Sequence, residues 1–175
     1  MATLVLTVIG DDQSGLVEQL SGVIADHGGN WDTSHMARLA GKFAGIVLIS
    51  VSDNNVDALV TDLEPLETEG LLHITAEQVT SDEQPDSAPT LLTLELFGQD
   101  HPGIVHDISH ALATKGVSID ELTTETKEAP MSGGILFKAT AVLRAPADVS
   151  MAELSEILED LANDLMVDVQ LEGLN

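Results

Sequence analysis

Two short loops in this chain carry residue types that could bind a small charged molecule. They read Asp12-Gln13-Ser14-Gly15 and Asp100-His101-Pro102-Gly103, and each stands directly before an apolar run with helical spacing. The start of a helix presents unpaired backbone N–H groups and a partial positive charge, which suit a carboxylate. A glycine lacks a Cβ and lets a ligand approach the backbone closely. Each loop therefore predicts a binding site for a small carboxylate.

An aspartate at the rim of each loop, Asp12 or Asp100, adds a carboxylate that could accept hydrogen bonds from an ammonium group. One loop would then offer partners for both ends of an α-amino acid. The alternative is structural, because an aspartate near a helix start often caps the helix or interacts with its dipole. The sequence leaves both interpretations open.

The two loops belong to an internal repeat. Residues 10–17 align with residues 98–105 at an offset of 88, and the same offset continues to Gly45 on Gly133 and Leu48 on Leu136. Leu59 matches Leu154 at an offset of 95, so we expect about seven extra residues in the second copy, around 143–149. The repeat predicts two homologous domains, 1–79 and 90–175, joined by a polar linker at 80–89 that contains two prolines.

Within each copy the hydrophobic periodicity alternates between strand and helix. Alternating leucines predict first strands around 4–8 and 92–96, and three-and-four spacing predicts helices over 16–24 and 104–112, with Pro102 at the first helical position. Glycines 28 and 116 are expected to end these helices. The later elements are expected near 30–38, 47–51, 56–66 and 71–79, and near 118–127, 135–139, 150–163 and 165–171. This repeated βαββαβ order predicts an α+β fold of two ferredoxin-like domains, each a four-stranded antiparallel sheet with two helices on one face.

The charge balance excludes a nucleic-acid-binding surface. The 175 residues include 30 acids against 6 Lys plus Arg, which gives a formal net charge of −24, whereas duplex binding requires clustered cations. One Trp and three Phe are too few for a platform that stacks bases. Without cysteine, the chain has no disulfide, thiol nucleophile or Cys-based metal site.

Neither a membrane segment nor a metal centre is expected. The start of the chain lacks the basic region of a signal peptide, and no apolar run approaches the roughly 20 residues that span a bilayer. We therefore expect a cytoplasmic protein. His106 and His110 are spaced like metal ligands, but no third ligand is evident, so we expect a solvated helix face and no cofactor. Trp31 is expected to pack at a domain or subunit interface.

The loop motifs resemble those of ACT domains. Gly-Asp-Asp-Gln-Ser-Gly-Leu-Val and Gly-Gln-Asp-His-Pro-Gly-Ile-Val are similar to that family's Asp-Arg-Pro-Gly-Ile-Val, and Asn30-Trp31-Asp32 or Ser118-Ile119-Asp120 follows each. Two such domains over essentially the whole chain are similar to the glycine cleavage system transcriptional repressor family. The resemblance implies that an amino acid contacts the loop and the start of the second strand, often between two domains. The implied ligand-binding residues are Asp12, Gln13, Ser14, Gly15 and Asn30, and Asp100, His101, Pro102, Gly103 and Ser118.

Both loops depart from the family pattern. Gln13 and His101 stand where the family has Arg, Ser14 replaces Pro, and Ser118 replaces Asn. Acylphosphatases share the βαββαβ order but need an anion-binding Arg in the first loop, and neither loop contains Arg or Lys.

The resemblance implies a non-enzymatic regulator that responds to a small amino acid, with glycine as the first candidate. The regulator would act through a partner protein, by resemblance a transcription activator, as a homo-oligomer with no direct contact to nucleic acid or membrane. The alternative is an ACT-type protein-interaction module whose ligand pockets are vestigial.

Overall fold

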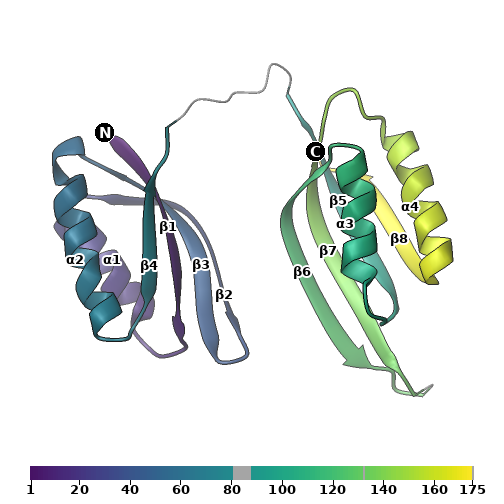
Figure 1. Ribbon diagram of the computed structural model, residues 1–175, viewed down its shortest axis with the longest axis horizontal. Coiled ribbons are helices and arrows are strands. Elements are labelled where there is room, and N and C mark those ends of the chain that lie inside the picture. Colours follow the sequence, from purple (N-terminus) through teal and green to yellow (C-terminus); the bar gives the residue numbers. More distant parts are fainter. Residues whose placement is uncertain (81–87, 132, 175) are drawn as a thin grey trace. The chain divides into compact units, whose positions relative to one another are not determined.

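The computed structural model describes residues 1–80, 88–131 and 133–174. The chain divides into two compact units, Met1–Glu83 and Gln84–Asn175 (Figure 1). Each unit contains its own hydrophobic core. Residues 81–87 of the expected linker lie outside the described residues, so the bounds of that linker stay a prediction.

The first unit has the predicted element order. Strand β1 (Ala2–Asp11) leads into helix α1 (Leu16–Asp26), and β2 (Asn30–Leu39) and β3 (Lys42–Val51) form a hairpin. A 3-10 turn, η1 (Asp53–Asn55), precedes α2 (Val56–Thr68) and β4 (His73–Gln78). The strands form one antiparallel sheet in the order β2-β3-β1-β4.

The second unit repeats this topology. Its elements are β5 (Thr90–Gln99), α3 (Ile104–Thr114), β6 (Ser118–Glu128), β7 (Ile135–Ala145), α4 (Met151–Leu165) and β8 (Val167–Gly173). The sheet order is β6-β7-β5-β8, and all pairs are antiparallel. The expected α+β fold of two ferredoxin-like units is therefore confirmed.

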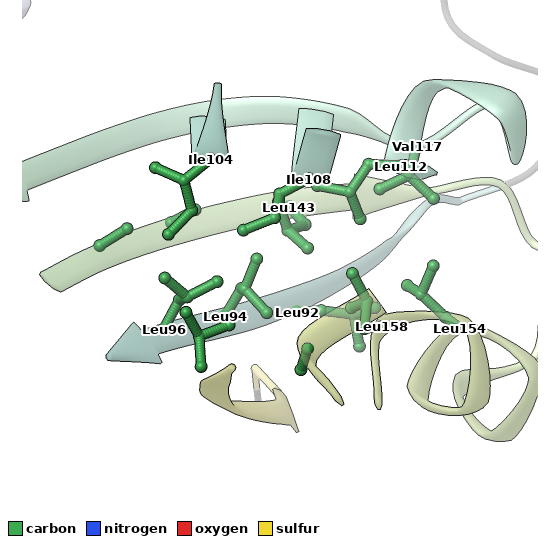
Figure 2. Packing of buried hydrophobic residues seen from close by; sticks show 14 of the residues in the cluster. Leu92, Leu94, Leu96, Ile104, Ile108, Leu112, Val117, Leu143, Leu154 and Leu158 are labelled. Atoms are coloured by element: carbon green, nitrogen blue, oxygen red, sulfur yellow. The ribbon is translucent and has the colours of Figure 1, made fainter. Parts of the chain in front are cut away.

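The alternating apolar residues of the first strand in each unit decide which face of the sheet the helices cover. Leu92, Leu94 and Leu96 of β5 are buried, and Figure 2 shows them facing Ile108 of α3 and Leu158 of α4. Complete burial of one such side chain stabilises a fold by about 1.5–3 kcal/mol. Among the described residues, no polar or charged residue is buried, so each core is held together by apolar packing.

The start of each first helix differs from the prediction. Gly15 and Gly103 occupy the N-cap positions with φ of 90° and 92°. Because glycine has no side chain, neither residue caps its helix with a side-chain hydrogen bond. Asp12 and Asp100 therefore do not occupy the N-cap positions, and their interaction with the helix dipole stays a prediction. Pro102 lies before the N-cap of α3 and not at the first helical position. The predicted helix ends are confirmed, because Gly28 and Gly116 follow α1 and α3 with φ of 67° and 69°.

The strand register also corrects the position of the extra residues in the second copy. Asp11 pairs with Lys42, whereas the equivalent Gln99 pairs with Leu136, so the offset has already risen from 88 to 94. Six extra residues therefore lie in the hairpin between β6 and β7, and only one lies between β7 and α4. The match of Gly45 with Gly133 is coincidental: the former is a strand residue of β3, and the latter lies in the hairpin with φ of 60°.

The second core holds a smaller side chain than the first at one position of its central strand β7. A small apolar cavity of about 30 Å³ lies beneath α3, with Ile108, Ile119 and Ala141 among its lining residues. By register, Ala141 is opposite Leu94 as Val47 is opposite Leu6 in the first unit. The first unit therefore carries two more side-chain carbon atoms at this place.

We expect the substitution Ala141→Val to raise the free energy of unfolding by about 1 kcal/mol, because it fills apolar space with a β-branched residue in a strand. Thermal or urea denaturation of the whole chain measures the change. The converse substitution, Val47→Ala, serves as the matched control and should lower stability by about 2 kcal/mol. A loss of stability in Ala141→Val would show that the cavity cannot accept the added carbons.

Candidate functional site

The first loop is held between α1 and the tip of the β2–β3 hairpin by its backbone. The Asp12 N–H donates to the Gly41 carbonyl oxygen at 2.9 Å, and the Gln19 N–H donates to the Gly15 carbonyl oxygen at 2.9 Å. The hairpin turn is Ala40-Gly41, with φ of 49° and 79°, as two-residue turns that suit the twist of a sheet require. The side chains of the loop are therefore not needed to hold its position.

A cation reaches this loop from the end of β2. The Arg38 Nε atom forms an ion pair with the Asp12 Oδ2 atom. The side chain of Asp12 is 32% exposed, and that of Arg38 is 69% exposed. Arg38 stands opposite Phe43 in the hairpin, and Phe43 stands opposite Gly10 of β1. Arg38 was not among the residues predicted for the site, although the tight hairpin turn that follows it could have revealed its position beside the loop.

A pocket open to solvent, of about 320 Å³, lies at this end of the first unit. Three of the predicted loop residues line this pocket, together with apolar residues that were not predicted from the sequence. Its lining residues are Asp12, Gln13, Gly15, Leu16, Val17, Glu18 and Phe43. Ser14 is exposed and is not part of this lining.

Several kinds of binding group lie in or beside the pocket. Asp12 supplies a carboxylate from the lining, and Arg38, which is not itself a lining residue, pairs with Asp12 and brings a guanidinium beside the pocket. The first turn of α1 presents backbone N–H groups that have no partner within the helix, and Gly15 leaves their approach uncovered by a side chain. Phe43 and Val17 add apolar surface. A small molecule with one positive and one negative group would find a partner for each here.

The second loop has the same backbone but different chemistry. The Asp100 N–H donates to the Ile135 carbonyl oxygen at 2.8 Å, as Asp12 does to Gly41. Thr126 stands opposite Phe137, at the register position that Arg38 occupies opposite Phe43. The second unit therefore has a neutral side chain where the first unit has its guanidinium.

A pocket of about 350 Å³ in the second unit lies toward the end of α4 and not over the start of α3. It is lined by Gln99, Asp100, His101, Asp164, Leu165 and Met166, and thus includes neither Pro102 nor Gly103. The His101 Nδ1 atom lies 3.2 Å from the Pro102 carbonyl oxygen. Its Nε2 atom is buried without a hydrogen-bond partner among the described residues.

The two predicted second-strand residues lie far from the loops within their own units. Asn30 pairs with Ser50 at one end of β3, whereas Asp11, beside the loop, pairs with Lys42 at the other end. Eight residues of β3 separate these points, which is roughly 26 Å. Asn30 instead donates to Asp32, and Ser118 stands opposite Arg144 of β7. A loop could meet such a residue only if a different domain supplied it.

The described structure does not place the remaining candidates, His106, His110 and Trp31, in a binding site. His106 and His110 stack with ring centroids 6.1 Å apart, and the described residues contain no group of three or more His, Cys, Asp or Glu that could hold a metal ion. Trp31 is partly buried and packs against the core of its own unit, and its contact with another domain or subunit stays a prediction. In the part of the chain that the structure describes, no helix has the length and apolar character needed to cross a membrane.

Comparisons with known proteins point to one family. An ACT domain family model matches residues 2–77. The chain is 22% identical over 172 residues to the glycine cleavage system transcriptional repressor of Escherichia coli (strain K12), with 98% of this chain and 90% of that protein covered. Among solved structures, an unknown protein from Galdieria sulphuraria is 30% identical with a TM-score of 0.88 and 99% of both chains covered. A candidate glycine cleavage system transcriptional repressor shares the fold, with 20% identity, a TM-score of 0.70 and 99% of this chain and 98% of that chain covered.

Proposed function

Because an ACT domain model matches the first unit and the whole chain resembles the glycine cleavage system transcriptional repressor, we propose that this protein is a tandem ACT-domain, non-enzymatic regulator whose first unit binds a small amino acid. Glycine is the first candidate ligand, on the basis of that resemblance. The regulator acts in the cytoplasm as a homo-oligomer, through contacts with a partner protein, by resemblance a transcription activator. The net charge of −24 supports indirect control of genes without contact to nucleic acid.

The observation that carries this proposal is the ion pair between Arg38 and Asp12 at the pocket of the first unit. A zwitterionic amino acid carries the same two charges, so it can replace one internal pair by two pairs with the protein. The exchange costs little, since an ion pair as exposed as this one contributes about 0–1 kcal/mol. The start of α1 adds N–H donors for the ligand carboxylate.

The lining of the pocket supports a small ligand and a binding role. A volume of about 320 Å³ is at the lower end of small-molecule sites, and Phe43 and Val17 are its apolar lining residues. The lining residues offer two carboxylates, an amide and apolar surface. They do not include a hydroxyl or imidazole with which a carboxylate could form a nucleophile and base pair.

The second candidate function is an ACT-type interaction module with vestigial pockets, and the second unit favours it. Thr126 replaces the arginine there, and the pocket lies away from Gly103. A chain whose first pocket had also lost its ligand would act only through protein contacts. The two candidates therefore differ in one measurable property, which is the response of the first unit to amino acids.

Thermal melting of the whole chain with each amino acid at millimolar concentration tests the proposal. A ligand that binds only the folded state raises stability by RT ln(1 + [L]/Kd), about 2.7 kcal/mol at one hundred times Kd. We expect a selective upward shift of the melting temperature, with glycine and serine measured first. Acetate and methylamine each carry one of the charged groups of glycine and should give no comparable shift. If no amino acid raises the melting temperature, the interaction module is the correct reading.

A further inference from the structure

The pocket of the first unit contains a second carboxylate besides that of Asp12. Glu18 lines this pocket from the first turn of α1. A Cβ at Gly15 would lie 4.0 Å from the Glu18 Oε2 atom, so the carboxylate leans back over the start of the helix. Asp12 is paired with Arg38, whereas the Glu18 carboxylate has neither an ion-pair partner nor a hydrogen-bond donor among the described residues. The protein thus leaves one acidic group of the pocket without a partner of its own.

The second unit separates a structural role of this acid from a role in the pocket. An acid in the first turn of any helix interacts favourably with the helix dipole. Helix α3 also has such an acid, Asp107, but it stands at the position equivalent to Gln19. His106 stands at the position equivalent to Glu18, and the pocket of the second unit includes neither residue. The dipole therefore does not require an acid at the position of Glu18, and a first-turn carboxylate in the pocket is a feature of the first unit.

The charged groups in and beside the pocket leave one negative charge in excess. Asp12 and Glu18 carry two negative charges, and Arg38 carries one positive charge. The α-ammonium and α-carboxylate groups of an amino acid add no net charge, so they leave this excess unchanged. A cationic group on the ligand side chain would neutralise the excess, and an anionic group would double it. The side chain of the ligand therefore decides how well the charges match.

We propose that Glu18 determines which side chains the pocket accepts: it favours a short side chain that ends in an ammonium group and disfavours one that ends in a carboxylate. With the α-carboxylate of the ligand at Arg38 and the first N–H groups of α1, and its α-ammonium at Asp12, Glu18 is the charged lining residue that remains for the side chain. Repulsion of the wrong ligand contributes to such selectivity as much as attraction of the right one. This inference rests on the proposed function, because it requires that the first unit binds an amino acid.

Isothermal titration of the whole chain with glycine and with two pairs of amino acids of matched shape tests the inference. The ligands α,γ-diaminobutyrate and norvaline differ in a terminal ammonium or methyl group, and aspartate and asparagine differ in a terminal carboxylate or amide. An exposed charge pair changes an affinity by up to about fivefold. We therefore expect α,γ-diaminobutyrate to bind about fivefold more tightly than norvaline, and aspartate to bind about fivefold more weakly than asparagine.

The variant Glu18→Gln removes the charge and keeps the shape of the side chain. Both preferences should then fall to within about twofold, because the charge that distinguishes the members of each pair is absent. Asp57→Asn is the matched control, since Asp57 is an exposed acid in the first turn of α2 and does not line the pocket. This variant should keep both preferences. Urea denaturation of the two variants measures any loss of helix stability separately from ligand selectivity.

The outcomes distinguish failure of this inference from failure of the proposed function. Preferences that persist in Glu18→Gln, or that Asp57→Asn reduces equally, would overturn the role of Glu18. If the unmodified chain binds glycine but does not discriminate within either pair, the inference is overturned and the proposed function stands. If neither glycine nor any of the four other amino acids binds, the inference and the proposed function both fail.

Discussion

Arg38→Met should abolish the amino-acid response of this protein at ligand concentrations that stabilise the unmodified chain. Charge-assisted hydrogen bonds contribute about 1.5–3 kcal/mol each, so the loss of the guanidinium should weaken binding by about 10-fold to 150-fold. Met keeps most of the apolar side chain while it removes the charge. Isothermal titration with the effector found by thermal melting measures the affinity directly.

Lys42→Met is the control for this change. Lys42 pairs with Asp11 and not with the pocket residue Asp12. Its replacement by Met removes one positive charge, as Arg38→Met does, but leaves the Arg38–Asp12 pair intact. We expect the affinity to change by less than about threefold, the effect of an exposed charge nearby. Equal losses in both variants would indicate a general electrostatic effect, and an unchanged affinity in Arg38→Met would remove Arg38 from the site.

Gly10→Ala should lower the free energy of unfolding of the first unit by about 3 kcal/mol or more. A Cβ at Gly10 would overlap the carbonyl oxygen of Leu71 and would also approach a Leu72 methyl group at 3.1 Å. The Leu71 carbonyl oxygen is a backbone atom and cannot rotate away as a side chain can. The contact between the end of β1 and the segment before β4 must therefore open. Overpacking of this kind usually costs about 1–3 kcal/mol and more where backbone has to move. Urea denaturation measures the loss.

Gly22→Ala provides the matched control within the same unit. Gly22 lies inside α1, and a Cβ there would meet nothing within 4 Å. Alanine in a helix interior is about 0.8–1 kcal/mol more favourable than glycine, so this variant should be more stable than the parent. If Gly10→Ala were as stable as Gly22→Ala, the result would contradict the close approach of the Leu71 carbonyl oxygen to Gly10.

The secondary structure was predictable because local patterns decide it. The alternation of leucines in β1 and β5 and the three-and-four spacing in α1 and α3 depend only on which face is buried. The positions of the extra residues were not predictable in the same way. Gly133 aligns with Gly45 without a gap, and only the pairing of Gln99 with Leu136 shows that the insertion lies in the hairpin. Register is a property of two strands and cannot be read from either one.

The site was predictable in part for the same reason. Asp12, Gln13 and Gly15 were identified because they are adjacent in sequence, and they line one pocket. Arg38 was missed because it is 26 residues from Asp12 and reaches it only through the turn at Ala40-Gly41. The resemblance implied that one ligand contacts both the loop and Asn30, often between two domains. Within one unit the antiparallel sheet places the start of β2 at the end far from the loop.

The two hairpins, which differ in length by six residues, have a practical consequence for engineering. Each carries the carbonyl group that accepts from the loop N–H, Gly41 in one unit and Ile135 in the other, and that hydrogen bond survives the insertion. The second unit thus shows that the fold tolerates six additional residues at this turn. A circularly permuted fluorescent reporter spliced after Ala40 would sit beside the pocket, and its emission would then report occupancy of the loop in living cells.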